Sequence, residues 1–116
     1  MWLGQAKAPD GLRLYAIGDV HGCDGLLAGA HGAIAEDLAR HPAADHRIVH
    51  VGDYVDRGPD SAAAIERLAR LRERDPRIVC LRGNHDELMA GFLDDPLGVG
   101  PTWLANGGGR TLADYG

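Results

Sequence analysis

Three short apolar runs each lead, directly or after one residue, into a glycine followed at once by an aspartate or asparagine. They cover residues 12–17, 48–51 and 78–81, and the polar residues that follow are Asp19, Asp53 and Asn84. Apolar runs rich in β-branched residues and bounded by glycine are typical of strands. The polar residues lie 34 and 31 positions apart, and one strand–helix–strand unit takes about 30 residues or more. The pattern therefore predicts consecutive units of this kind.

Helical patterns fill the intervals between these runs. Apolar residues recur at steps of three and four from Leu27 to Leu38 and from Ala64 to Leu71. We expect the first helix to begin at Asp24 or Gly25, and the second to span the interval from about residues 59–61 to 75–76. A third helix is expected from about His85 to Leu93, and a loop at Gly98, Gly100 and Pro101. The fold class is therefore α/β, with the order βαβαβ and mainly parallel strands.

Length and composition limit the function classes. The 116 residues allow one domain, for which we predict a flexible tail at residues 1–10 and a folded part at residues 11–116. The 12 basic and 17 acidic residues give a net charge of −5, which argues against a basic nucleic-acid-binding surface. No apolar run is long enough for a membrane span. Cys23 and Cys80 lie far apart, which favours reduced thiols and a cytoplasmic protein.

The polar residues after the strands suit metal-assisted phosphate chemistry. Parallel strands end at one edge of a sheet, where open α/β sheets bind ligands. Carboxylate, imidazole and amide donors suit Mn²⁺, Zn²⁺ or iron better than Ca²⁺. Two such ions would relieve the repulsion between the acids and accept a phosphate. Arg57 could bind phosphate oxygens, and His85, oriented by Asp56, could protonate a leaving alkoxide.

Three ordered motifs resemble the signature of the calcineurin-like metallophosphoesterases. They are GDVHG at 18–22, GDYVDRG at 52–58 and GNHD at 83–86. The longer strings VGDYVDRGPDS and LRGNHDE, and residues 103–116, resemble the phosphoprotein-phosphatase branch and its bacterial serine/threonine phosphatases. The resemblance covers residues 12–116. It implies the first half of a metallophosphoesterase-type α/β sandwich, with residues 11–116 as the N-terminal portion of the catalytic domain.

The resemblance also implies a role for each motif residue. Two divalent ions are implied, Mn²⁺ first, with iron and Zn²⁺ as the other choices. The first ion would bind Asp19 and His21, the second Asn84, and Asp53 would bridge the two. A hydroxide between the ions would attack phosphorus in line, His85 would be the general acid with Asp56 as its partner, and the phosphate would contact Arg57 and Asn84.

The resemblance implies a metal-dependent phosphoester hydrolase, with phosphoserine or phosphothreonine proteins or small phosphoesters as substrates. The alternative within the family is a symmetrical diadenosine tetraphosphate hydrolase, which shares GDVHGC and GNHD. The family supplies two further histidine ligands from its second half, whereas the last histidine here is His85. We therefore also consider a truncated, inactive chain, with weak metal affinity and association through an exposed sheet edge.

Each candidate also has a plain structural interpretation. Aspartates after glycine are common turn residues, Asn84 could cap a helix together with Glu87, and Asp56 with Arg57 could be a surface turn pair. The remaining histidines are interpreted as structural, with His31 on a helix surface. Structural roles are likewise expected for several others, namely Cys23, Trp103, Asn106 and Gly107.

Overall fold

The computed structural model describes residues 4–116. Of the predicted flexible tail, residues 1–3 lie outside the described residues, and residues 4–10 form neither helix nor strand. The flexibility of this tail stays a prediction.

Three parallel strands form one sheet in the order β1-β2-β3. They are β1 (Leu12–Ile17), β2 (Asp45–His50) and β3 (Ile78–Cys80). The α/β class with parallel strands is thus confirmed. Strand β2 begins three residues before the apolar run, because Asp45, His46 and Arg47 pair with the start of β1. That pairing partner is 33 positions away, so the local pattern could not show it.

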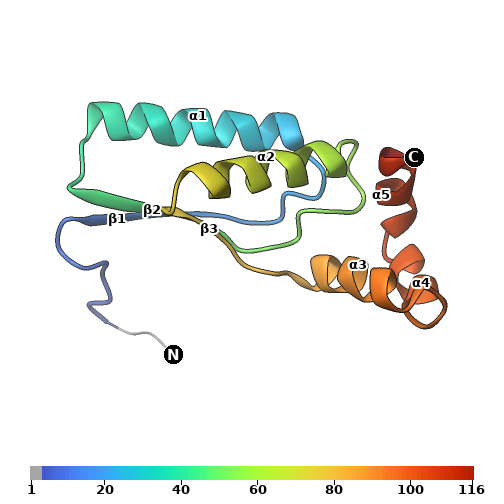
Figure 1. Ribbon diagram of the computed structural model, residues 1–116. Helices are drawn as coiled ribbons and strands as arrows, with labels where there is room; N and C mark the ends of the chain where they lie inside the picture. Colours follow the sequence, from blue (N-terminus) through green and yellow to red (C-terminus); the bar gives the residue numbers. More distant parts are fainter. Residues whose placement is uncertain (1–3) are drawn as a thin grey trace.

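Two long helices cover one face of the sheet (Figure 1). They are α1 (Asp24–Arg40) and α2 (Ser61–Arg74), each connecting neighbouring parallel strands. Each helix connects one strand to the next strand on the same side of it. Because both connections are right-handed crossovers, both helices lie on the same face of the sheet. Ile34, Ile48 and Ile78 form one core cluster between helices and sheet. A second cluster lies nearer the carboxyl ends of the strands and contains Val20, Leu27, Tyr54, Val55, Ala64 and Leu68.

Three shorter helices follow β3 and lie beyond the carboxyl ends of the strands (Figure 1). They are α3 (Asn84–Asp94), α4 (Pro96–Ala105) and α5 (Gly108–Tyr115). The loop predicted at residues 98–101 is wrong, since these residues belong to α4. Pro96 is tolerated in the first turn, and the Asp95 carboxylate accepts a hydrogen bond from the Gly98 amide at 3.0 Å. The helix also buries Trp103, which is 1% exposed.

The opposite face of the sheet carries exposed apolar side chains. Leu14, Val51 and Leu81 are 52%, 46% and 49% exposed. Alternation along each strand places Leu14 and Ala16 on this face, while Tyr15 and Ile17 point toward the helices. In residues 4–116, none of the helices has the length and apolar character that crossing a membrane requires.

Candidate active site

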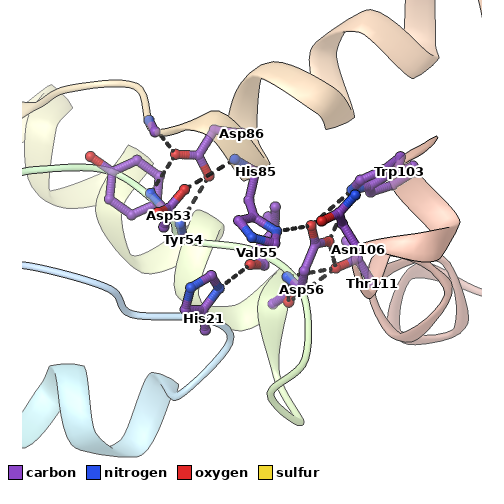
Figure 2. A network of polar contacts seen from close by, with 12 residues as sticks. His21, Asp53, Tyr54, Val55, Asp56, His85, Asp86, Trp103, Asn106 and Thr111 are labelled. Carbon is purple, nitrogen blue, oxygen red and sulfur yellow. Dashed lines mark hydrogen bonds and ion pairs between the residues drawn. The ribbon is translucent and has the colours of Figure 1, made fainter. Parts of the chain in front are cut away.

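The three motif loops lie against one another at the carboxyl edge of the sheet (Figure 2). The His21 amide donates to the Asp53 carbonyl at 2.8 Å, and the Gly22 amide donates to the Tyr54 carbonyl at 2.8 Å. The His85 amide donates to Asp53 Oδ1 at 3.0 Å. Asp53 therefore contacts both of the other loops.

Strained backbone is concentrated in these loops. Five non-glycine residues in the described part of the chain have positive φ, and all are predicted site residues. They are Asp19 (49°), His21 (40°), Asp53 (57°), Asp56 (77°) and Arg57 (71°). Such conformations cost about 1–3 kcal/mol each and persist where the surrounding structure enforces them, often at functional sites.

Gly83 permits the closest approach between two of the loops. A Cβ at this position would lie 2.3 Å from Asp53 Oδ1 and 2.4 Å from the Asp53 amide nitrogen. A side chain here would push Asp53 away from the start of α3. The glycine of the third motif is thus required by packing, although its own φ of −88° is open to other residues.

Asp86 organises the junction between the second and third loops. Its carboxylate accepts hydrogen bonds from the amides of Asp53 (2.7 Å), Tyr54 (2.9 Å) and Gly83 (2.9 Å). The helix cap considered for Asn84 is therefore wrong, since Gly83 is the N-cap and Asn84 is the first, exposed residue of α3. Asp86 lies in the first turn, where a carboxylate satisfies otherwise free amides.

The donor atoms in these loops fit a divalent metal. The His21 Nδ1–H donates to the Val55 carbonyl at 2.8 Å, so Nε2 keeps its lone pair. Such a bond on the other ring nitrogen is usual for metal-ligating histidines. One Asp53 oxygen is held by the His85 amide, and the other is left for a ligand. Asp19 and Asn84 are exposed.

These residues do not form a closed metal site. Among residues 4–116, no three histidine, cysteine, aspartate or glutamate side chains gather closely enough to hold an ion. Asp19, His21, Asp53 and Asn84 therefore remain a proposed ligand set.

His85 and Asp56 form a buried pair beside the loops. The His85 Nδ1–H donates to Asp56 Oδ2 at 2.7 Å, and the two residues are 4% and 0% exposed. The His85 ring lies edge-on to that of His21, with centroids 4.7 Å apart. The pairing of His85 with Asp56 that the resemblance implies is thus present.

Arg57 is placed differently from its neighbour Asp56. Its side chain is exposed, and no ion pair of its guanidinium is found within residues 4–116. The surface turn pair considered for Asp56 and Arg57 is therefore wrong, because Asp56 is fully buried. An unpaired guanidinium at the rim of the loops can bind an anion.

Trp103 and Thr111 also contact the Asp56 carboxylate, which the sequence analysis did not anticipate. The Trp103 indole N–H lies 3.0 and 2.9 Å from the two oxygens, and the Thr111 hydroxyl donates to Oδ1 at 2.8 Å. The two residues follow Asp56 by 47 and 55 positions. Only their placement on α4 and α5 brings them to this carboxylate.

The other histidines do not join the site. His31, predicted on a helix surface, is half-buried, and its Nε2 lies 2.8 Å from Nε2 of His50, which is fully buried in β2. Burial lowers the pKa of both imidazoles. His50 also donates from Nδ1 to the Val79 carbonyl at 3.1 Å. Cys23 and Cys80 are free thiols.

Sequence similarity to known proteins identifies the family of the chain. A family model described as "Calcineurin-like phosphoesterase" matches residues 12–115, and the chain belongs to this family. It is 35% identical over 103 residues to a serine/threonine-protein phosphatase 1 from Salmonella typhimurium, covering 88% of this chain and 42% of that protein.

Symmetrical bis(5'-nucleosyl)-tetraphosphatases are also similar to the chain. The protein from Pseudomonas fluorescens is 40% identical over 72 residues, which are 62% of this chain and 22% of that protein. The protein from Bordetella pertussis is 39% identical over 82 residues, which are 68% and 26% of the two chains. The chain thus spans less than half the length of these relatives.

Proposed function

We propose that the protein is a metal-dependent phosphoester hydrolase of the serine/threonine phosphatase type. The main support is the buried His85–Asp56 pair, 2.7 Å apart, beside loops that present carboxylate, imidazole and amide donors. The proposed substrates are phosphoserine or phosphothreonine proteins and small phosphoesters. Free Cys23 and Cys80 agree with the cytoplasmic location that belongs to this proposal.

In this proposal Asp19, His21, Asp53 and Asn84 would hold two divalent ions, with Mn²⁺ as our first choice and iron or Zn²⁺ next. When bound, the ions would activate water and neutralise phosphate charge. Asp53 is suited to contact both ions, since it lies between the first and third loops.

The remaining residues would bind the phosphate and handle the proton. Arg57 would hold phosphate oxygens through its exposed guanidinium, with the Asn84 amide beside it. His85 keeps Nδ1–H on Asp56, so a proton on Nε2 can pass to the leaving alkoxide. The Asp56 carboxylate holds the imidazole by this hydrogen bond. Phosphoester and water would thus yield phosphate and alcohol.

A symmetrical dinucleoside tetraphosphate hydrolase is the second candidate. Relatives with that name match the chain at 39–40% identity. The stretch from Tyr54 to Arg57 resembles the phosphatase branch more closely, which favours the first candidate. Turnover of a phosphoserine peptide and of diadenosine tetraphosphate, each with Mn²⁺, separates the two.

The substitution Asp53→Asn tests the proposed function. It removes the charge proposed to serve two ions. Because losing a group that merely orients a metal ligand already costs about 10–100-fold, we expect Mn²⁺-dependent turnover to fall at least about a hundredfold. The matched control is Asp94→Asn, at the exposed end of α3, which should leave turnover unchanged. Full Mn²⁺-dependent turnover by the Asp53→Asn protein would contradict the proposal.

A further inference from the structure

The Asp56 carboxylate is enclosed by donors from three different helices. Its oxygens accept from His85 at the start of α3, Trp103 in α4 and Thr111 in α5. Figure 2 shows His85 on one side of this carboxylate and the two later residues on the other. Because Asp56 is 0% exposed, water is not available to replace a lost donor.

The three donors together fix the orientation of the carboxylate. Trp103 Nε1 reaches both oxygens at 3.0 and 2.9 Å, Thr111 holds Oδ1, and Oδ2 faces the His85 imidazole. The Asp56 amide in turn donates to the Thr111 hydroxyl at 2.9 Å and lies 3.1 Å from the Ser61 hydroxyl. Thr111 therefore holds both the backbone and the side chain of Asp56.

The turn between α4 and α5 is packed closely enough to maintain these contacts. A Cβ on Gly107 would lie 3.0 Å from Arg57 Cγ, and Gly107 has a φ of 103° that favours glycine. A Cβ on Gly108 would lie 2.4 Å from the Trp103 indole ring. The glycines at 107 and 108 thus allow α4 and α5 to pack closely against the loop that contains Asp56.

We propose that Trp103 and Thr111 are positioning residues, which act through Asp56 to orient His85 for proton donation to the leaving group. This inference rests on the proposed hydrolase function. Neither residue needs to touch substrate. Removing either donor leaves the buried Asp56 carboxylate with an unsatisfied hydrogen-bond acceptor and allows it to rotate away from His85.

The leaving group of the substrate distinguishes positioning from general destabilisation. A serine alkoxide needs a proton as it leaves, whereas p-nitrophenolate leaves without one. Trp103→Phe keeps an aromatic ring, although a smaller one, and removes the donor. We therefore expect kcat to fall about tenfold on a phosphoserine peptide and less than about twofold on p-nitrophenyl phosphate. Thr111→Val should act in the same way, and Thr111→Ser, which keeps the hydroxyl, should restore turnover.

Two controls address packing and the route of the effect. Phe92→Leu alters the ring that packs on Trp103, with centroids 4.9 Å apart, but removes no donor. It should not change the ratio between the two substrates. In an Asp56→Asn background, Trp103→Phe should have no further effect, because residues that act through one group are not additive. An equal fall of kcat on both substrates in the Trp103→Phe protein would overturn the proposal. So would a further fall of about tenfold in kcat when Trp103→Phe is added to Asp56→Asn.

A spectroscopic measurement on the full chain tests the positioning without turnover. The proton on His85 Nδ1 should give a downfield NMR resonance, which Trp103→Phe and Thr111→Val shift upfield or broaden and Phe92→Leu leaves in place. An unchanged resonance in both donor variants would overturn the positioning role. If the wild-type chain hydrolyses neither substrate while the resonance responds as expected, the proposed function fails and the positioning of His85 stands.

Discussion

Among single residues, the half-buried His31 pairs with the fully buried His50, and neither belongs to the site. His50 donates from Nδ1 to the Val79 carbonyl, so its Nε2 accepts and His31 Nε2 donates across the 2.8 Å contact. This arrangement requires the His50 ring to be neutral, since a protonated Nε2 could not accept. Burial lowers the pKa of each, and for His31 the neighbouring His50 and then Arg67 lower it further, against a smaller opposing effect of Asp24.

Stability should therefore fall as the pH drops below about 6.5, the ordinary pKa of histidine. Below that value the unfolded chain binds protons that the folded pair resists, so the free energy of unfolding decreases as pH falls toward the lowered folded pKa values. The carboxyl of Asp24, whose pKa Arg67 lowers from 3.8, loses its contribution only at more acidic pH. Urea unfolding at pH 7.5 and 5.5 measures the difference.

Replacing one ring identifies the source of this pH dependence. His31→Gln keeps a donor toward His50 and removes one titrating group, so its loss of stability between the two pH values should be smaller than that of the wild type. His41→Gln, at an exposed histidine, is the matched control and should behave as the wild type does. An identical loss in the His31→Gln protein would refute the assignment.

Among the elements, α2 depends on a residue from the other end of the chain. Asp60 precedes α2 and is a common capping residue type, yet its side chain makes no capping hydrogen bond. The Ala62 amide instead donates to Asp114 Oδ2 in α5 at 2.7 Å. The carboxylate also lies at the positive end of the α2 dipole. Helix α5 thus both caps α2 and supplies Thr111 to the site.

We expect Asp114→Ala to lower the free energy of unfolding by about 0.5–2 kcal/mol, the usual cost of a lost cap. Asp60→Ala should change it much less, because no capping bond is lost. Chemical denaturation of the two variants makes the comparison. A larger loss from Asp60→Ala than from Asp114→Ala would show that α2 is capped locally.

In the molecule as a whole, the surface area and the radius of gyration both exceed those of a compact domain. The accessible surface is 7390 Å², against about 6,100 Å² for a compact protein of this mass. The radius of gyration is 16.3 Å, against about 13 Å for a compact domain of this length. Exposed Leu14, Val51 and Leu81 belong to this excess apolar surface.

An apolar dye that fluoresces on hydrophobic surface should therefore bind the native chain. Replacing Leu14 and Leu81 together by serine should reduce the fluorescence clearly. Leu97→Ser, on α4 and 91% exposed, should reduce it little, since it does not lie on the sheet. An equal reduction by the two changes would contradict this account. Sedimentation of the same samples tests the association predicted through the sheet edge.

The parts of the fold that local pattern specifies were predicted well. Strand β1 begins and ends where the apolar run does, and α1 begins at one of the two expected residues. The grouping of the three motif loops at one edge also follows from sequence, because parallel connections allow few arrangements. The error at residues 98–101 arose because glycine and proline usually end a helix, whereas α4 contains Pro101 in its interior and buries Trp103.

The sequence by itself determined the α/β class, the order of the motifs and the donor types that meet at the carboxyl edge, since these follow from periodicity and from the spacing of short motifs. Only the tertiary structure decided that Asp86 joins two loops, that Trp103 and Thr111 hold Asp56, and that His31 faces His50. Those contacts join residues 19 to 55 positions apart. Their formation depends on how helices and strands pack, which no local pattern of residues records.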